Sequence, residues 1–241
     1  MLAFESVSSW KQDAPSYVSL NRSELLSSIA ERISGLSTRR IRVAVDGFPA
    51  AGKTVFADQL AEKVRELRRP TLRTSFDNFK HPWRDARDKG YDRTSGFGYY
   101  KNAPDFESAI NLLLEPSGPN GSGSVALCGF DPLTGIDYRH VQVNVPNNSI
   151  LIVDSMFALR PEYNFYWDYR IWLEVPISLS LSRGITRDAV SEGFVEAEDV
   201  HRNRYHEAEK LYFEEVTPKS IANLIIDNSD FDNPIVVERG D

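Results

Sequence analysis

The segment around Gly47–Thr54 constrains the fold of this chain more than any other feature of its sequence. Residues 47–54 read Gly-Phe-Pro-Ala-Ala-Gly-Lys-Thr and match the phosphate-binding pattern G-x-x-x-x-G-K-[ST] at every defined position. A β-branched apolar run at 41–46 precedes the loop, and residues 55–61 have the spacing of a helix. A glycine-rich turn that merely joins a strand to a helix is the alternative. Because strand, loop, Lys-Thr and helix stand in order, the sequence predicts a loop that binds a nucleoside triphosphate.

Each part of this loop has a separate physical role. The glycines let the backbone curl so that its amides converge on phosphate oxygens, and the helix adds its positive N-terminal end. Lys53 is expected to neutralise the β- and γ-phosphates, and Thr54 to hold Mg²⁺. The implied cofactors are ATP and Mg²⁺, with the choice between ATP and GTP left open. The predicted nucleotide-binding residues are Gly47, Phe48, Pro49, Ala50, Ala51, Gly52, Lys53, Thr54 and Val55.

Apolar runs that alternate with helical patterns predict an α/β fold. Strands are expected at 41–46, 71–76, 150–153, 170–175 and 222–226, while residues 1–20 have no readable period. Five such strands separated by helices indicate a five-stranded parallel sheet in a three-layer arrangement. The runs 125–130 and 140–145 flank a turn and predict an inserted β-hairpin. We expect one domain over residues 1–241, with the hairpin insertion at about 124–146.

The composition excludes several other classes of protein. With 41% hydrophobic and 26% charged residues, the chain resembles ordinary soluble proteins, and its net charge of −7 argues against nucleic acid as a partner. Cys128 is the single cysteine, which excludes an intramolecular disulfide and a thiolate zinc site. Neither a signal peptide nor a membrane-spanning stretch is recognisable, so a cytoplasmic location is expected. A homo-oligomer is left open.

Two aspartates follow predicted strands and are candidates for the chemistry. Asp77 comes just after the strand at 71–76, where it could accept a proton from an attacking hydroxyl and help to hold Mg²⁺. A helix cap or a turn would also explain Asp77. Asp154 ends the apolar run 150–153, the pattern of an acid that contacts Mg²⁺ directly or through water. Because a hydrophobic strand that ends in Asp is common, this pattern gains weight only from the phosphate-binding loop.

Two arginines could complete a phosphoryl-transfer site. Arg183 and Arg187 stand four residues apart and therefore share one face of a predicted helix. Two guanidinium groups above a phosphate chain would spread the charge that develops during transfer. A solvated helix face, with Arg187 paired to a neighbouring acid, is the alternative.

These features occur in an order that resembles the uridine kinase-like branch of the P-loop kinases over residues 15–231. The resemblance implies the three-layer P-loop kinase fold with a helical lid at about 183–205. It also implies Asp77 as general base, Asp154 in the metal shell, and Arg183 and Arg187 on the lid. The catalytic residues are thus expected to be Asp77, Lys53, Arg183 and Arg187, and the metal-binding residues Thr54, Asp154 and Asp77. The matching segments are 46–54, 77–79, 98–100 before 105–106, 150–154, 183–188, 204–212 and 218–228.

The chain departs from this family at the acceptor side. Uridine kinases resemble one another in a Tyr-Asp segment with a downstream His, where this chain has Phe130-Asp131-Pro132 without that His. A basic Gly-Arg after the lid helix is replaced by Gly193-Phe194. The resemblance therefore does not extend to uridine as the substrate.

The acceptor pocket is expected from segments 77–103 and 125–145, which offer aromatic and polar side chains. Any of the aromatic residues could instead belong to the core. We expect a kinase for a hydroxyl of a small molecule, with a nucleoside as the first candidate. The alternatives are a kinase of a sugar or vitamin, and a nucleotide-binding ATPase or regulatory protein without acceptor activity. The candidate substrate residues are Asp77, Phe79, His81, Arg84, Tyr99, Tyr100, Phe130 and Asp131.

Overall fold

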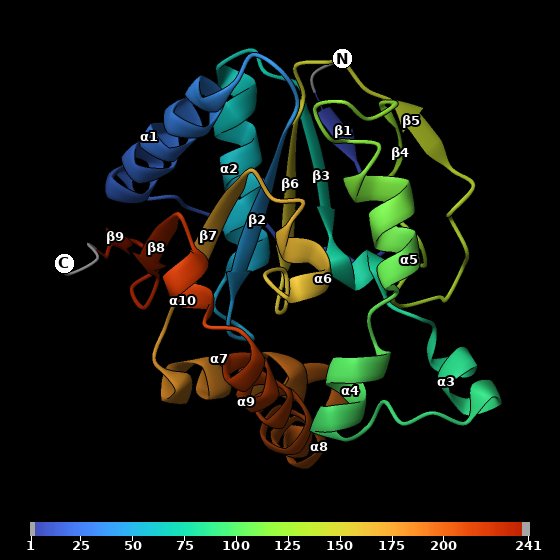
Figure 1. Ribbon diagram of the computed structural model, residues 1–241. Coiled ribbons are helices and arrows are strands. Elements are labelled where there is room, and N and C mark those ends of the chain that lie inside the picture. The colour runs from blue at the N-terminus through green and yellow to red at the C-terminus, as the bar shows by residue number, and fades with distance from the viewer. Residues whose placement is uncertain (1–2, 238–241) are drawn as a thin grey trace.

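A mainly parallel sheet organises the chain in the computed structural model, which describes residues 3–237 (Figure 1). Its strands lie in the order β1-β3-β6-β2-β7-β8-β9, and all neighbours are parallel except β8 and β9. The strands are β1 (Ala3–Glu5), β2 (Ile41–Gly47), β3 (Thr71–Ser75), β6 (Ile150–Ser155), β7 (Tyr169–Glu174), β8 (Leu224–Asp227) and β9 (Ile235–Val236).

The predicted α/β class with a parallel central sheet is confirmed, but the predicted number of five strands is wrong. β1 and β9 extend the sheet at its two edges. Each has only two or three residues, too few to show an alternating pattern. They form because the edge strands offer unpaired backbone groups: β1 joins β3, and β9 joins β8.

Helices cover both faces of the sheet. α1 packs on α2, and α2 lies against β2, β3 and β6. α5 and α6 cover the other face, where the rings of Phe106 and Tyr163 lie 5.1 Å apart. The helical elements are α1 (Leu20–Leu36), α2 (Lys53–Glu66), η1 (Phe76–Phe79), α3 (Trp83–Lys89), α4 (Gly96–Asn102), α5 (Phe106–Ser108), η2 (Ala109–Leu114), α6 (Pro161–Asn164), α7 (Ile177–Glu192), α8 (Phe194–Asp199), η3 (Val200–Tyr205), α9 (His206–Glu215) and α10 (Pro218–Ile221).

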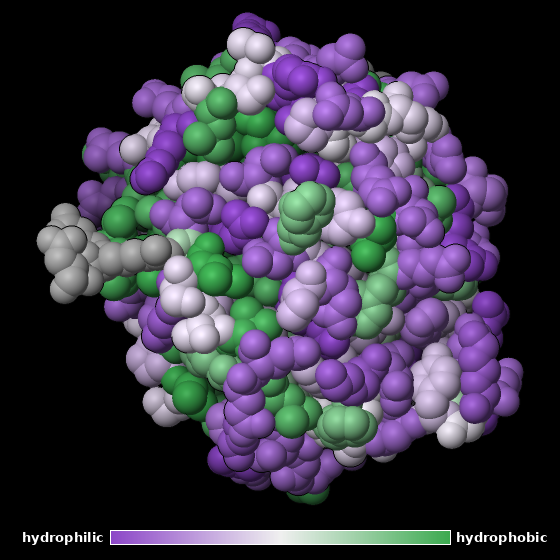
Figure 2. Space-filling model, in the orientation of Figure 1, coloured by the Kyte–Doolittle hydropathy of each residue, from purple (hydrophilic) through white to green (hydrophobic). Residues whose placement is uncertain are grey.

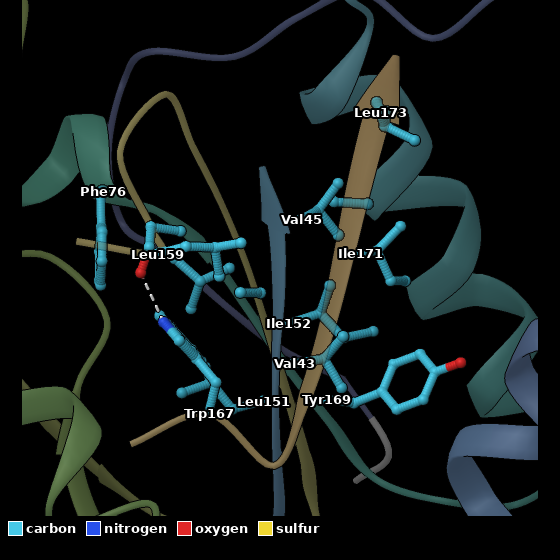
Figure 3. Close-up of a cluster of buried hydrophobic side chains, with 14 of the residues drawn as sticks. Val43, Val45, Phe76, Leu151, Ile152, Leu159, Trp167, Tyr169, Ile171 and Leu173 are labelled. Atoms are coloured by element: carbon cyan, nitrogen blue, oxygen red, sulfur yellow. Dashed lines mark hydrogen bonds between the residues drawn. The ribbon is translucent and has the colours of Figure 1, made fainter. Parts of the chain in front are cut away.

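The core follows from the alternation of side chains along buried strands. Figure 3 shows Val43, Ile152 and Ile171 on the side of the sheet that faces α2, and Leu151 and Trp167 on the opposite side. The Trp167 indole donates to the carbonyl oxygen of Ala158 at 2.7 Å, which satisfies its one polar atom. Both faces of the central strands are therefore apolar, as a three-layer fold requires.

The inserted hairpin is present but shorter than expected. β4 (Ser124–Ala126) pairs with β5 (Gln142–Asn144) in antiparallel register. The rest of the predicted strands is irregular, because the amides of Gly129 and Phe130 donate to the carbonyl oxygen of Asn78 and the amide of Val141 donates to that of Tyr138.

The carboxyl ends of the parallel strands carry the part of the molecule that concerns function. Helices α4, α7, α8 and α9 gather at this end of the sheet (Figure 1). On the face in Figure 2, hydrophilic residues predominate and apolar residues reach the surface in dispersed places. Within residues 3–237, none of the helices combines the length and the apolar character needed to span a bilayer.

Candidate active site

Two glycines determine the shape of the loop between β2 and α2. Gly47 and Gly52 have φ angles of +156° and +86°, which residues with side chains rarely adopt. A Cβ on Gly47 would lie 2.5 Å from the carbonyl oxygen of Leu173, and one on Gly52 would lie 2.8 Å from Nδ2 of Asn228. Both glycine positions of the phosphate-binding pattern are therefore required by the geometry.

Side chains from distant elements hold this loop in place. Nδ2 of Asn228, just after β8, donates to the carbonyl oxygen of Ala51 at 2.7 Å. The Ser180 hydroxyl on α7 donates to the carbonyl oxygen of Pro49, also at 2.7 Å. The loop is thus fixed from two sides before any ligand binds.

Lys53, the first residue of α2, is buried inside the loop. Its Nζ donates to the carbonyl oxygen of Phe48 at 2.6 Å. Burial lowers the pKa of Lys53, and the carboxylates of Asp46, Asp154 and Asp77 oppose that shift. An ammonium has three donors, so it can bond phosphate oxygens in addition to the loop carbonyl.

A cavity of about 290 Å³ lies against the loop. The residues predicted to be catalytic or metal-binding, which come from four elements of the fold, all line it. Of the predicted nucleotide-binding residues, Gly47, Phe48 and Ala51 belong to the loop but not to this wall. The residues of the wall are Trp10, Gln12, Pro49, Ala50, Gly52, Lys53, Thr54, Val55, Asp77, Lys80, Tyr99, Asp154, Ser155, Met156, Arg183, Arg187 and Tyr205.

Thr54 and Asp154 form the part of the cavity that suits a magnesium ion. The Thr54 hydroxyl donates to Oδ2 of Asp154 at 2.7 Å, which links the first turn of α2 to β6. A hydroxyl that donates its proton keeps its oxygen lone pairs for a cation. Hydroxyl and carboxylate oxygens are ligands that Mg²⁺ takes together with phosphate oxygens and water. The residues present therefore fit the ion.

Asp77 meets a cation that the sequence analysis did not single out. Nζ of Lys80 lies 2.5 Å from Oδ1 of Asp77 and donates to the Tyr99 hydroxyl at 2.6 Å. Burial alone would raise the pKa of Asp77, but the neighbouring Lys80 ammonium, assisted by Lys53, holds that pKa below its usual value. The Asp77 carboxylate is therefore ionised and able to accept a proton.

The two arginines of α7 line the cavity while they are held by other partners. Arg183 donates to the carbonyl oxygen of Ser229 at 2.6 Å. Arg187 pairs with Asp188 at 2.6 Å, and Asp188 also bonds His201 of η3 at 2.7 Å. Arg187 therefore has the neighbouring acid that the solvated-face alternative requires, although it also faces the cavity.

The arrangement of sheet, loop and cavity can be compared with known proteins. Comparisons with protein-family models and with curated proteins find no match. Among solved structures, a protein described as a possible uridine kinase from Bacillus stearothermophilus aligns with a TM-score of 0.64 at 20% identity, covering 85% of this chain and 96% of that one. The chain has the fold of the uridine kinase-like P-loop kinases.

Two further structures share this kinase fold. A protein described as a candidate fructose transport system kinase from Silicibacter aligns with a TM-score of 0.66 at 20% identity, covering 81% of this chain and 95% of that one. D-glycerate 3-kinase from Cryptococcus neoformans aligns with a TM-score of 0.54 at 10% identity, covering 89% of this chain and 97% of that one. At these identities the similarity establishes the fold, as the family resemblance predicted, and leaves the substrate undefined.

Within this kinase fold, the predicted acceptor residues are dispersed. Asp77 and Tyr99 line the loop cavity, whereas His81 and Phe130 line a separate cavity of about 680 Å³. Phe79 is buried and borders a small cavity of about 20 Å³ beside Asp77.

The other three acceptor candidates lie outside these cavities. Tyr100 is buried in the core, and its hydroxyl donates to Glu215. Asp131 is buried in the hairpin turn, where it accepts from Ser9. Arg84 is exposed on α3 and pairs with Asp85. The structure therefore does not bring these three residues to the loop cavity.

Three side chains of the site were not predicted from the sequence. Lys80 stands three residues after Asp77, a spacing that offers a pairing partner within one short helical segment. Arg73 is a charged residue in the middle of a strand that is buried throughout, which signals a buried ion pair. Asn228 stands in the final matching segment of the sequence but showed no sign of its contact with the loop.

Two buried acids lie beneath the phosphate-binding loop. Burial raises the pKa of Asp46 to about 6, although hydrogen bonds from Tyr212 and Gly47 oppose the shift. Burial also raises the pKa of Glu209 to about 8, and its Oε1 has no hydrogen-bond partner. Glu209 is therefore largely protonated near neutral pH.

The Glu209→Gln variant is expected to gain stability over the wild type as the pH rises from 5 to 8. The folded state binds the Glu209 proton more tightly than the unfolded chain does, so ionisation lowers the wild type's free energy of unfolding across that range. The gain should reach roughly 2–4 kcal/mol at pH 8 in urea unfolding. Exposed Glu207 on the same helix provides the control, Glu207→Gln. If the difference in free energy of unfolding between Glu209→Gln and the wild type stayed constant with pH, the raised pKa of Glu209 would be contradicted.

Proposed function

We propose that this chain is a kinase that transfers the terminal phosphate of ATP to a hydroxyl group of a small molecule. The observation that carries the proposal is the shared cavity: a phosphate-binding loop, an ionised carboxylate at Asp77 and two arginines line one space of about 290 Å³. These are the parts that phosphoryl transfer needs, namely positioning of the phosphates, a proton acceptor and compensation of charge.

Each residue of the cavity has a separate role in phosphoryl transfer. The loop amides and Lys53 bind the phosphates, and Asp77 takes the proton of the attacking hydroxyl. Arg183 and Arg187, on a lid at about 183–205, compensate the charge on the transferred group. Thr54 and Asp154 would hold Mg²⁺, with Asp77 assisting, and the ion supplies charge neutralisation at the phosphates when bound.

The acceptor that the sequence resemblance favours is a nucleoside, but Lys80 supports a second class. Its ammonium lies in the cavity wall between Asp77 and the Tyr99 hydroxyl, next to the place where the acceptor hydroxyl must approach. A cation at that place suits an acidic acceptor such as a hydroxy acid. The fold shared with D-glycerate 3-kinase supports this second candidate. A neutral sugar or a neutral vitamin has no negative charge to pair with this ammonium.

A thermal-shift screen with a non-hydrolysable ATP analogue and Mg²⁺ tests the acceptor class. Nucleosides, neutral sugars and hydroxy acids are compared, because a ligand at 100 times its Kd stabilises the folded state by about 2.7 kcal/mol. We expect a shift for one acceptor class. Loss of that shift in Lys80→Met indicates an acidic acceptor, and its retention indicates a nucleoside or other neutral acceptor.

An assay of ATP consumption with and without the compounds of that screen separates a kinase from a regulatory ATPase. A kinase should hydrolyse ATP slowly alone and consume it faster with its acceptor. If the analogue stabilises the protein but no compound in the screen adds to that stabilisation or accelerates ATP consumption, the result favours a regulatory ATPase and contradicts the kinase proposal.

We place this activity in the cytoplasm, with no nucleic-acid partner, in keeping with the net charge of −7.

A further inference from the structure

Arg73 lies directly behind the proposed metal-binding residues. It stands in the middle of β3 and is buried, with only 8% of its surface exposed. Its Nη2 lies 2.7 Å from Oδ1 of Asp154, and its Nε lies 2.6 Å from Oδ1 of Asp58 on α2. Nη2 also donates to the carbonyl oxygen of Thr54 at 3.2 Å. A buried charge persists in a fold only where it is paired and hydrogen-bonded in this way.

Each oxygen of the Asp154 carboxylate has one close neighbour and keeps a lone pair for a cation. Oδ2 accepts from the Thr54 hydroxyl and Oδ1 faces Arg73. The second acid of the cavity, Asp77, is likewise paired with Lys80. Each acid on the wall of the cavity therefore has its own cation.

The remaining charges on the wall are positive. Lys53 and Arg183 face the cavity in addition to the two ion pairs, and so does Arg187, which is paired with Asp188. A divalent cation that arrives alone therefore meets net repulsion, whereas a triphosphate brings the negative charge that the site lacks.

We propose that Arg73 is a positioning residue that holds Asp154 toward Thr54 and prevents the nucleotide-free site from taking up a free divalent cation. The inference rests on the proposed function for the identity of the metal site. It concerns the affinity of that site for metal alone, which can be measured without turnover.

Binding of Mn²⁺ without nucleotide, followed by the EPR signal of the free ion, tests this role. We expect no saturable binding at this site in the wild type at millimolar Mn²⁺. Arg73→Met leaves the carboxylates of Asp154 and Asp58 without their cation and should bind Mn²⁺ about ten- to hundredfold more tightly than the wild type. Arg73→Lys keeps the charge and should behave as the wild type.

Two controls locate the effect. Asp58→Asn removes the other partner of Arg73 but leaves the Asp154 pair, so it should bind no more Mn²⁺ than the wild type. Adding Asp154→Asn to Arg73→Met should abolish the gained binding. If thermal unfolding shows that Arg73→Met does not fold, Arg73→Met is combined with Asp58→Asn, which removes one charge of each sign. This double variant should also bind Mn²⁺ about ten- to hundredfold more tightly than the wild type.

Two outcomes would overturn the role of Arg73: tight Mn²⁺ binding by the wild type without nucleotide, or no gain on loss of the guanidinium. Either result is independent of the kinase proposal, which stands or falls with acceptor-dependent turnover. If Arg73→Met gains Mn²⁺ binding but the wild type phosphorylates no acceptor, the role of Arg73 is supported and the kinase proposal is contradicted.

Discussion

Replacing Asp77 by asparagine is expected to lower phosphorylation of the acceptor by roughly two to four orders of magnitude while nucleotide binding persists. The amide keeps the size of the side chain and its place after β3, but it cannot accept the proton of the attacking hydroxyl. Nucleotide binding should persist because the loop and Lys53 do not depend on this carboxylate for their position. Steady-state turnover and the thermal shift with the ATP analogue measure the two effects separately.

Two variants control for the loss of negative charge at Asp77. Asp88→Asn removes an exposed carboxylate from α3, outside the loop cavity, and should leave turnover unchanged. Adding Lys80→Met to Asp77→Asn tests whether the unpaired Lys80 ammonium, rather than the missing base, causes the loss. If Asp77→Asn turned over its acceptor at the wild-type rate, Asp77 would not be the base.

Replacing Lys53 by methionine is expected to remove the stabilisation by nucleotide and to lower turnover by roughly 10²–10³-fold or more. The loop presents its amides and one buried ammonium to the phosphates, and the ammonium is the only full positive charge that the loop itself carries. Methionine has a similar length but no charge and no donor, so the fold of the loop should be preserved.

Lys63 on the same helix offers the matched control. Its side chain is 21% exposed, lies outside the loop cavity and pairs with Glu66 one turn later. Lys63→Met should therefore keep both the nucleotide-induced thermal shift and the rate. An unchanged thermal shift with nucleotide in Lys53→Met would mean that the loop binds triphosphate without its lysine, contrary to the assignment.

The donor side of the site could be predicted from sequence because its information is local. The glycines, the lysine and the threonine of the loop occupy fixed positions within eight residues, and the backbone angles at Gly47 and Gly52 explain that spacing. Asp77 and Asp154 could be proposed because parallel strands place their carboxyl ends at one edge of a sheet. The five central strands were equally readable from their apolar runs.

The charge pairing within the site could not be predicted because it depends on the order of strands. Arg73 and Asp154 are far apart in sequence and meet only because β3 lies beside β6, an order that no local pattern specifies. Tyr100 was assigned to the acceptor pocket for its aromatic ring, but its hydroxyl bonds Glu215 of a distant helix. The short helices α3 and α4 were missed because neither is long enough to show a helical period.

Transfer of phosphate to a hydroxyl is the central claim, and ³¹P NMR of the reaction tests it most directly. The wild type is incubated with ATP, Mg²⁺ and the acceptor selected by the thermal-shift screen. The proposed function predicts that a phosphomonoester resonance grows in step with ADP and that Asp77→Asn slows this growth by roughly two to four orders of magnitude. Release of inorganic phosphate alone, at a rate that the acceptor does not change, would contradict it.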